Sequence, residues 1–520
     1  MNLRALMANT THLYGNKIAL VEGNNQLTFR ELNEKVNQVA NGLLQKGIKK
    51  GERISLYLKN CHEYLIFRMA MEKVGIVYIP VNYYLSISEV EYIIKNSGSI
   101  AIVCDKQSYE NIGKMNLENQ VDFLFSPAPL NDSDTRLVSY CEFTEKYRKE
   151  EPEIDVDEND LCSINYTSGT TGKPKGVMLS QRNWIEVYKN MLINREINQD
   201  DRLLHLGPLT HASGSYFMPF YLKGAQSIII PNGFDIDNFF NHLETYKITA
   251  FTCVPTVLIR IMNDPRILTI DKSSLKMIGY GASPMPTDKI KKALEIFGPI
   301  LVQNYGQTEA YMTVTYLSKE DHVEAVQMGS ERLSSVGKPY TFVEVEIADD
   351  AGNPLDPGQI GELIVRSNHV MQGYWNLPDE TKATIRNGWL FTGDLAKKDE
   401  QGYVYLLGRK KEMIISGGFN IYPLEIEEVL HSIPSIHEAA VIGVEDEEWG
   451  EKVVSFLVKE DQQQAFSLEH IAHICKKSLG YKKPKEYILI DSLPKNSIGK
   501  IDKKRLKEIY YSKKESAQIG

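Results

Sequence analysis

The amino-acid sequence predicts an α/β protein: a large N-terminal domain of layered α/β subdomains with a small β-barrel-like subdomain, then a small mobile α+β C-terminal domain. Three observations carry this prediction. The chain has 520 residues, more than one hydrophobic core usually organises, so two or more domains are expected. Short apolar runs alternate with helical patterns in the first half. The sequence pattern then changes near Ser335 and again after residue 413.

The first half predicts parallel sheets covered by helices. Segment 27–47 carries leucine, valine and alanine at helical spacing and stops at Gly47, which indicates a helix. Short apolar runs that predict strands lie at 53–58, 75–81, 99–104, 202–207, 225–231, 248–255 and 275–281. Strands that alternate with helices in this way indicate α/β layers with largely parallel sheets.

The remainder of the chain has a different pattern. Segment 343–367 alternates apolar and polar residues around Gly/Pro turns, which is typical of a hairpin or small barrel. After residue 413 two amphipathic helices are predicted at 424–433 and 468–479, and strands at 438–444 and 452–460. We therefore place the domains at 1–410 and 411–520. The short basic break between them is either a simple linker or a hinge.

Composition and charge exclude several classes of protein. Hydrophobic residues make up 42% and charged residues 24%, as in ordinary soluble proteins. A net charge of -9 argues against nucleic acid or an anionic membrane as the main partner. The N-terminus lacks the apolar core of a signal peptide, and no apolar run is long enough for a stable membrane insertion.

The cysteines indicate the compartment. The six are far apart, and none forms a CxxC pair or a Cys/His cluster with zinc spacing. We expect buried free thiols in a reducing compartment, and hence a cytoplasmic protein. No feature of the sequence indicates an oligomeric state.

The run YTSGTTGKPKGV at 166–177 predicts a phosphate-binding loop. It departs from the P-loop pattern, because Pro174 follows Gly172-Lys173 and Thr167 stands where the first glycine is required. Its physical ingredients are nevertheless suited to an anion, since glycine lets backbone N–H groups close around phosphate oxygens while hydroxyls and lysines add donors and charge. A strand at 163–166 and a helix at 180–192 flank it. The alternative is a merely flexible surface loop.

Four further motifs follow the loop: NYGQTEA (304–310), GWLFTGDL (388–395), GRKKEMIISGGFNIYPLEIEE (408–428) and PKNSIGKIDKKRL (494–506). Together with the loop, in this order and spacing, they closely resemble the signatures of the adenylate-forming (AMP-binding) superfamily, acyl- and aryl-CoA synthetase branch, over essentially the whole chain. The resemblance implies a ligase that makes an acyl-adenylate and pyrophosphate from an acid and ATP, then transfers the acyl group to a thiol. It implies ATP, Mg²⁺ and CoA.

The resemblance assigns roles at the nucleotide. Tyr305 matches the aromatic stacked on adenine, Thr308 a phosphate ligand and Glu309 the Mg²⁺ carboxylate. Asp394 matches the carboxylate that binds the ribose hydroxyls, and Arg409 a second ribose or phosphate contact. Read alone, Tyr305 could be a core residue, Asp394 an Asx-turn residue and Arg409 a solvated arginine. The other nucleotide-binding positions implied are Thr167, Ser168, Gly169, Thr170, Thr171, Lys175, Ala282, Gln303 and Asn304.

The C-terminal motifs imply a second set of roles. Lys500 matches the lysine that contacts the carboxylate and α-phosphate oxygens, against the alternative of one more solvated lysine in the tail. Lys411 matches the hinge about which the small domain rotates between the half-reactions. Gly417 and Gly418 match the loop that lets a pantetheine arm approach.

The resemblance places the acid pocket at His211 to Ser215, around Val254, and at Tyr280 to Ala282, with Gly281 included. Segment 211–222 holds no charged residue, which favours a neutral aliphatic or aromatic tail. A Tyr280 ring that filled the pocket would favour a short- to medium-chain or aromatic acid; the alternative is a ring packed under the sheet. His211 matches a catalytic position near the reacting carboxylate, with a buried core histidine as its alternative.

Competing functions remain open at this point. A stand-alone acyl-CoA ligase of fatty acid metabolism is the leading hypothesis. The rivals are an acyl-AMP ligase that loads a separate carrier protein on its phosphopantetheine, an amino-acid adenylation domain, and a catalytically silent nucleotide-binding scaffold. Segment 208–215 lacks the aspartate that would bind an amino acid's ammonium group. Glu309 and Lys500 argue against a silent scaffold, and ATP–pyrophosphate exchange would discriminate.

Overall fold

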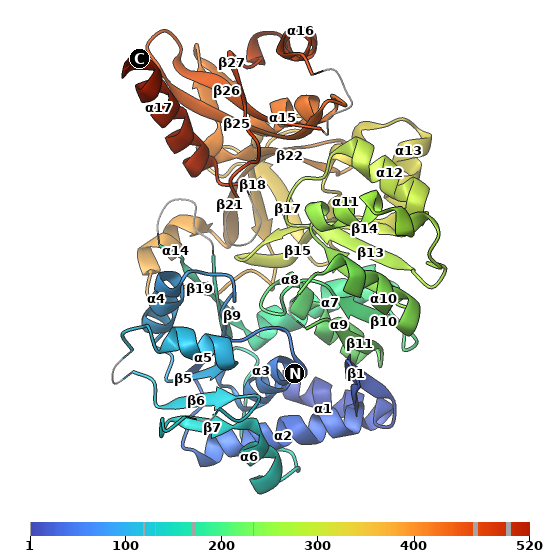
Figure 1. Ribbon diagram of the computed structural model, residues 1–520, viewed down its shortest axis with the longest axis vertical. Helices are drawn as coiled ribbons and strands as arrows, with labels where there is room; N and C mark the ends of the chain where they lie inside the picture. The colour runs from blue at the N-terminus through green and yellow to red at the C-terminus, as the bar shows by residue number, and fades with distance from the viewer. Residues whose placement is uncertain are drawn as a thin grey trace.

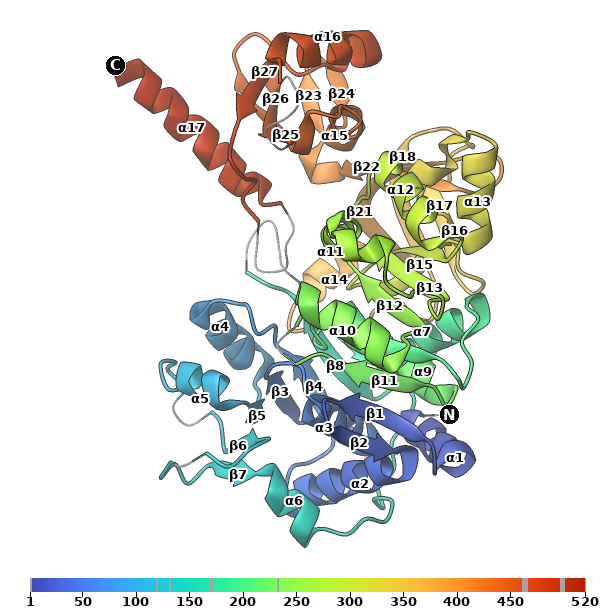
Figure 2. The ribbon, with the colours of Figure 1, turned by 45° about the vertical axis from the view of Figure 1, so that its right-hand side comes forward.

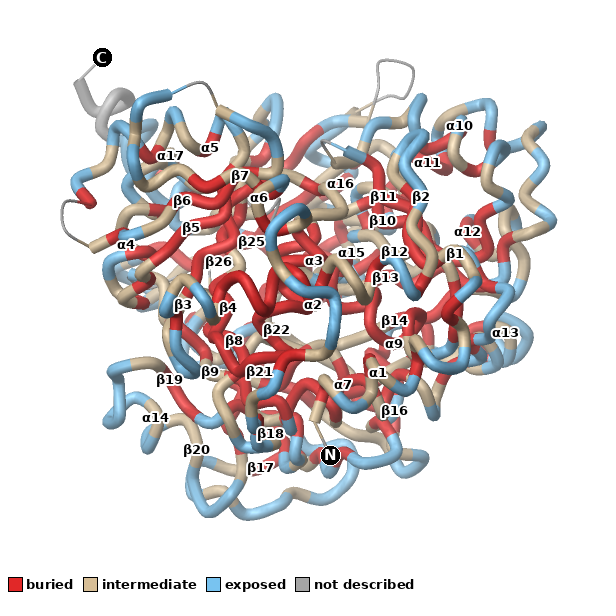
Figure 3. The backbone as a smooth tube through the Cα atoms, turned by 90° about the horizontal axis from the view of Figure 1, so that it is seen from below, coloured by how far each residue is buried: buried red, intermediate tan, exposed pale blue. Residues whose placement is uncertain are grey.

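The computed structural model describes residues 2–117, 120–130, 132–167, 173–231, 233–460, 466–495 and 501–519. Two large sheets with their helices form the body of the molecule, and the C-terminal residues form a smaller unit at one end (Figures 1 and 2). Buried residues follow the strands through the centre, and exposed residues gather on outer turns and helices (Figure 3). The predicted fold class is confirmed.

The first large sheet has eight strands in the order β19-β9-β8-β4-β3-β5-β6-β7. Its parallel strands are β3 (Arg53–Tyr57), β4 (Val77–Pro80), β5 (Ala101–Cys104), β6 (Phe123–Ser126), β7 (Leu137–Ser139) and β8 (Leu161–Tyr166), and the antiparallel β9 (Gly176–Ser180) and β19 (Gly373–Tyr374) close one edge. The helices of this part are α1 (Leu3–Tyr14), α2 (Phe29–Gln45), α3 (His62–Val74), α4 (Ile87–Ser97), α5 (Lys106–Ile112) and α6 (Tyr140–Lys146). Helix α2 begins with a capping box in which Thr28 and Glu31 satisfy each other's backbone N–H groups.

The second large sheet has nine strands in the order β16-β15-β14-β13-β12-β10-β11-β1-β2. Its parallel centre is β1 (Ile18–Glu22), β10 (Arg202–His205), β11 (Gln226–Ile229), β12 (Ala250–Cys253), β13 (Met277–Gly281) and β14 (Leu301–Gln307), flanked by antiparallel β2 (Asn25–Thr28), β15 (Ala310–Leu317) and β16 (Lys338–Pro339). Its helices are α9 (Phe217–Leu222), α10 (Ile236–Tyr246), α11 (Pro255–Asn263), α12 (Thr287–Phe297) and α13 (Lys319–Gln327). Helix α7 (Gln181–Asn194) packs against β9 of the first sheet and β15 of the second, and so joins the two layers.

Two smaller sheets follow. The third is antiparallel and contains β17 (Glu344–Ala348), β18 (Gly361–Arg366), β20 (Ile385–Arg386), β21 (Trp389–Lys398) and β22 (Val404–Arg409). Helix α14 (Pro378–Thr384) lies beside it. The fourth contains β23 (Ile414–Ser416), β24 (Phe419–Ile421), β25 (Ile436–Asp446), β26 (Gly450–Lys459) and β27 (Glu486–Leu489), with α15 (Pro423–His431), α16 (Leu468–Leu479) and α17 (Lys503–Ile519). The third sheet ends before residue 410 and the fourth begins after residue 413. That the chain divides into two independent domains at 410/411 stays a prediction.

Two expectations need correction. The glycine-rich loop does not connect a strand to a helix, because its second flank is β9, which pairs antiparallel with β8 before α7 begins. In the sequence the loop therefore falls between the two paired strands of a hairpin. The cysteines are all free, but only Cys104, Cys162 and Cys475 are buried, and Cys141 is exposed. Among the described residues, no helix is both long and apolar enough to cross a membrane.

Candidate active site

Four motif-bearing segments leave neighbouring parallel strands at their carboxyl ends. The His211 segment follows β10, Val254 follows β12, Ala282 follows β13, and Thr308-Glu309 form the turn after β14. These strands are adjacent in the second sheet. The carboxyl ends of parallel strands meet at one edge, where α/β proteins bind their ligands. The topology thus gathers segments that lie about 100 residues apart in the chain.

Tyr305, Asp394 and Arg409 form a hydrogen-bonded group, here called the nucleotide cluster. The Tyr305 hydroxyl donates to Asp394 Oδ2 at 2.5 Å, and Arg409 Nε lies 3.0 Å from Asp394 Oδ1. Asp394 and Arg409 are direct partners across β21 and β22. Burial and the Asp394 carboxylate raise the pKa of Tyr305, so it remains a phenol. Burial acts to lower the pKa of Arg409, but the charge of Asp394 raises it overall.

Glu309 lies beside the base of the glycine-rich hairpin. The Tyr374 hydroxyl donates to Glu309 Oε1 at 2.8 Å, and Lys175 Nζ lies 5.1 Å from the centre of the Tyr374 ring. Lys175 also pairs with Glu380 on α14 at 2.5 Å. Thr167 closes the hairpin by donating its N–H to the Lys175 carbonyl at 3.0 Å. Lys175 and Glu309, from two separate motifs, therefore meet at Tyr374.

Several predicted site residues lie outside the described residues: Ser168, Gly169, Thr170, Thr171 and Lys500. Their flanks are described. Lys495 and Ile501 form an antiparallel bridge on either side of the Lys500 segment. Lys503, at the start of α17, pairs with Glu412 at 3.2 Å, only three residues beyond Arg409.

The residues on either side of Lys411 are held by different parts of the molecule. Lys410 pairs with Asp350 at 2.6 Å and Glu362 at 2.9 Å, both in the third-sheet region. Glu412 shares Lys503 with Glu427 of α15, in the C-terminal part. Lys411 itself is exposed. Further on, Gly417 and Gly418 form the two-residue turn of the β23–β24 hairpin with φ of 59° and 81°, a conformation that favours glycine.

The Tyr280 ring packs under the sheet, which was the alternative to lining the acid pocket. The ring is 2% exposed and belongs to the core on the α13 side of the sheet. His322 Nδ1 lies 2.6 Å from the Ser318 carbonyl and donates to it, so Nε2 accepts the Tyr280 hydroxyl at 2.8 Å. Burial lowers the pKa of His322 to about 4, which keeps it neutral. Gln303 faces the same core, with Oε1 3.3 Å from the Tyr280 hydroxyl, so its side chain does not join the nucleotide cluster.

The opposite face of β13 carries glycine. A β-carbon on Gly279 would lie 2.9 Å from Thr252 Cγ2 and 3.5 Å from the Tyr216 hydroxyl. One on Gly281 would lie 2.3 Å from the Asn304 carbonyl. Alternation along the strand therefore turns Tyr280 into the core and leaves Gly279 and Gly281 on the opposite face, Gly279 beside Tyr216 and Gly281 beside Asn304. Ala282 follows with φ of 67°, in the left-handed region.

The other predicted acid-side residues have these contacts. His211 begins α8 (Ala212–Ser215), and its Nδ1 lies 2.8 Å from the Thr210 hydroxyl. Ser215 is buried and donates to the Tyr311 hydroxyl at 3.3 Å. Val254, in contrast, is exposed at the start of α11.

Four side chains that hydrogen-bond to one another are here called the Tyr216 cluster: Arg195, Tyr216, Asn304 and Tyr340. Asn304 is half-buried and the other three are buried. Sequence reasoning missed those three. Only Asn304 was predicted as a site residue. Arg195 ends α7 within the polar run NREINQDD, which reads as surface. Burial acts to lower the pKa of Arg195, but Tyr216 and Tyr340 raise it overall, so the guanidinium stays charged.

Glu22, His62 and Glu63 are the group of possible metal ligands found among the described residues. His62 Nδ1 lies 2.8 Å from Glu22 and Nε2 3.1 Å from Glu63. Burial acts to lower the pKa of His62, but the two carboxylates raise it to about 9. The group is therefore a paired imidazolium, which offers no lone pair to a metal.

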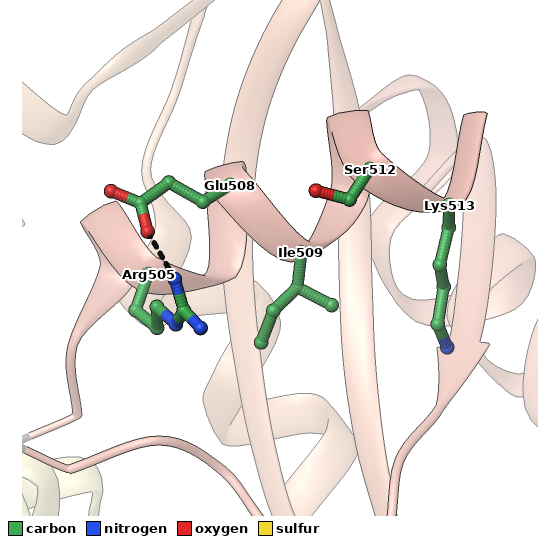
Figure 4. A pocket seen from close by; sticks show the side chains of 5 residues that line it. All are labelled: Arg505, Glu508, Ile509, Ser512 and Lys513. Carbon is green, nitrogen blue, oxygen red and sulfur yellow. Dashed lines mark hydrogen bonds and ion pairs between the residues drawn. The ribbon is translucent and has the colours of Figure 1, made fainter. Parts of the chain in front are cut away.

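A shallow surface hollow lies elsewhere, on α17. It is lined by Arg505, Glu508, Ile509, Ser512 and Lys513, all from that one helix, and Arg505 pairs with Glu508 at 2.7 Å (Figure 4). None of the predicted site residues lines it.

Comparison with known proteins shows the family of this chain. Residues 8–375 match the family model of the AMP-binding enzyme, and residues 425–500 match that of the AMP-binding enzyme C-terminal domain. A medium/long-chain-fatty-acid–CoA ligase of Mycobacterium tuberculosis is 32% identical, with 97% of this chain and 90% of the relative covered. A feruloyl-CoA synthase of Amycolatopsis is 34% identical, with 93% and 94% covered. The structure of o-succinylbenzoate CoA synthetase from Bacillus subtilis, in complex with its acyl-adenylate, has a TM-score of 0.83, 28% identity, and 96% and 97% covered.

Proposed function

The chain belongs to the AMP-binding enzyme family, in the acyl-CoA synthetase branch of the adenylate-forming superfamily, and on that premise we propose that it joins a fatty or aromatic carboxylic acid to CoA through an acyl-adenylate. The observation that supports this most is the meeting of two carboxylates with the motif side chains at one edge. Asp394 is held by Tyr305 and Arg409, and Glu309 is held by Tyr374.

In the first half-reaction a carboxylate oxygen of the acid attacks the α-phosphorus of ATP, and the bond to pyrophosphate breaks. Asp394 is suited to accept hydrogen bonds from the two ribose hydroxyls, and Arg409 to contact ribose or phosphate. Tyr305 stays protonated beside Asp394, and its ring is the surface for adenine. The loop from Thr167 to Thr171, with Lys175, binds the phosphates through N–H groups, hydroxyls and charge.

Glu309 fits a Mg²⁺ ion. Tyr374 occupies Oε1, and no hydrogen bond from the described residues reaches Oε2. Carboxylate oxygens are the ligands that Mg²⁺ prefers, usually one or two of them together with substrate phosphates. When bound there, the ion would offset negative charge on the phosphate oxygens. Thr308 and Glu309 share the same turn, so the phosphate contact and the metal ligand are positioned together.

Lys500 is the catalytic lysine in this proposal, and it stabilises the charge that develops as pyrophosphate leaves. The anchoring of Lys503 to Glu412 supports a placement of this segment near the hinge and the nucleotide cluster. Lys410 is held to the third-sheet region by ion pairs, and Glu412 is held to the C-terminal part. Lys411 therefore lies between two neighbours that are anchored to different parts of the molecule. That is the arrangement a hinge requires.

In the second half-reaction the thiolate of CoA attacks the acyl carbon, and AMP leaves. The turn at Gly417 and Gly418 is exposed and has no side chains at its tip, so a pantetheine arm can approach the backbone there. His211 contacts the reacting end of the acid in this proposal. The unpaired cysteines suit a reducing cytoplasm.

A panel of carboxylic acids of graded length and ring type, assayed with ATP, Mg²⁺ and CoA, tests this function. We expect AMP, pyrophosphate and an acyl-CoA with at least one fatty or aromatic acid. Pyrophosphate release and acyl-adenylate without CoA thioester would instead favour a carrier-protein acceptor. No ATP–pyrophosphate exchange with any acid would leave only a nucleotide-binding scaffold.

A further inference from the structure

The Tyr216 cluster is a closed hydrogen-bonded group drawn from four distant segments. Asn304 Oδ1 accepts from Arg195 Nη2 and, at 2.6 Å, from the Tyr340 hydroxyl. Arg195 Nη2 also donates to the Tyr340 oxygen at 2.8 Å, and Asn304 Nδ2 donates to the Tyr216 oxygen at 2.9 Å. The exposed fractions are 7% for Arg195, 3% for Tyr216 and 1% for Tyr340, so water satisfies little of it.

The donors and acceptors in this cluster do not balance. Arginine only donates, so the atom of Asn304 that faces Arg195 must be the oxygen, and the nitrogen must face Tyr216. The Tyr216 oxygen therefore accepts, and its own O–H points elsewhere. Arg195 Nε and Nη1 are buried without a hydrogen-bond partner. Among the described residues, the cluster therefore has hydrogen-bond donors without acceptors, and the Asn304 oxygen already accepts two hydrogen bonds.

Charge adds to this imbalance. The Arg195 guanidinium lies 4.8 Å from the centre of the Tyr216 ring, and no carboxylate pairs with it among the described residues. A buried charge without a counter-ion is costly and is normally compensated. A cation on the ring face and an amide donor on the oxygen both make the Tyr216 hydroxyl a stronger hydrogen-bond donor.

The Tyr216 hydroxyl lies on the face of β13 that carries Gly279. It lies 3.5 Å from the β-carbon position of Gly279, on the face of β13 opposite Tyr280. Tyr216 directly follows the His211–Ser215 segment. Because Gly279 has no side chain, β13 places only backbone atoms next to this hydroxyl.

We propose that the Tyr216 hydroxyl donates a hydrogen bond to an acceptor oxygen on the tail of the acid, with Arg195 and Asn304 as positioning residues. This inference rests on the proposed function and narrows its substrate class. The preferred acid carries a hydroxyl, alkoxy or second carboxylate group away from the reacting end. The sequence suggested a neutral tail because segment 211–222 is uncharged. The positive charge of Arg195 lies over the Tyr216 ring in the same segment, so a neutral or a negatively charged acceptor is compatible with it.

The test compares matched acids. Cinnamic acids with a 4-hydroxyl, 4-methoxy or 4-carboxyl group are assayed against 4-methylcinnamic acid, and 12-hydroxydodecanoic acid against dodecanoic acid. We expect kcat/KM to be about tenfold or more higher for the oxygenated member, because a buried donor left unpaired rejects the analogue. Preference for the carboxylate over the hydroxyl would assign the main effect to the charge of Arg195; preference for the neutral groups would assign it to Tyr216.

Substitutions test whether the Tyr216 cluster causes the preference for oxygenated acids. Tyr216→Phe should reduce the ratio to within about twofold by lowering only the oxygenated acids, since one donor is lost. Tyr316→Phe is the matched control: its hydroxyl accepts from Asn194 at 3.2 Å outside the cluster, and the ratio should stay as in wild type. A wild-type ratio near one, or a ratio that Tyr216→Phe leaves unchanged, overturns the inference. Absence of pyrophosphate release with every acid would instead overturn the proposed function itself.

Discussion

Adjacent residues of β14 serve two different regions. Tyr305 points to Asp394 and Arg409, in the nucleotide cluster. Asn304 points to Arg195, Tyr216 and Tyr340, in the Tyr216 cluster. The strand pleat separates the two by directing successive side chains to opposite faces.

The two clusters differ in how they are encoded. The nucleotide cluster uses residues from recognisable motifs, with its carboxylate directly paired to a cation. The Tyr216 cluster combines one residue from a motif, Asn304, with three residues that lie in no motif. Its cation, Arg195, forms no ion pair with a carboxylate among the described residues. If the two proposals hold, the residues that act on every substrate come from local motifs, and the residues that contact one class of acid come from distant positions in the chain.

The largest effect is expected from a substitution that impairs adenylation of every acid. Lys500→Ala should reduce adenylation by about 10²–10³-fold, by analogy with the loss of one oxyanion donor. The factor should be the same for every acid, because the lysine acts on the reacting end and not on the tail. Transfer from a supplied acyl-adenylate to CoA should be largely spared. Pyrophosphate release measured acid by acid checks this, and a factor that varied with the tail would break the comparison.

The hinge comes next. Lys411→Pro should permit adenylation but slow thioester formation by roughly 10-fold or more, because proline fixes φ between two anchored neighbours. Lys411→Ala keeps the backbone free and serves as the control. Single-turnover assays of acyl-adenylate and acyl-CoA separate the two steps. Normal acyl-CoA formation by the proline variant would show that the hinge lies elsewhere.

A smaller effect is expected at Tyr374. Tyr374→Phe removes the hydrogen bond to Glu309, which should lower the adenylation rate about tenfold and raise the Mg²⁺ concentration needed for half-maximal rate. The change should again be uniform across acids, in contrast to that of Tyr216→Phe. A Mg²⁺ titration with two acids of different tails makes the measurement. Equal Mg²⁺ requirements in variant and wild type would remove Tyr374 from this role.

The smallest effect on catalysis is expected at Tyr280. Tyr280→Phe should cost about 1 kcal/mol of stability through the lost hydrogen bond to His322. Substrate preference should not change, because the ring faces the core. Thermal unfolding together with the acid panel checks both points. Tyr280→Gly sharpens the test: a shift toward longer acids in a folded variant would restore the pocket assignment.

Much of the fold was predictable because hydrophobic periodicity is local. The run at 275–281 predicted β13, and the helical spacing at 27–47 predicted α2. Strand β9 was missed because GVMLS is short and directly precedes a strong helix pattern. The direction of the Tyr280 ring was left open, since it depends on which face of β13 carries α13 and His322.

The sequence by itself determined the fold class, the family and the residue types of the nucleotide cluster, because these depend on spacing within single motifs. Only the tertiary structure decided which side chains meet: Tyr374 with Glu309, Glu412 with Lys503, and Arg195 with Tyr216. The physical reason is that parallel strands bring their carboxyl ends to one edge regardless of separation in the chain. Arg195 is buried because the layers of the fold pack around it. The residues next to it in the sequence do not predict this burial.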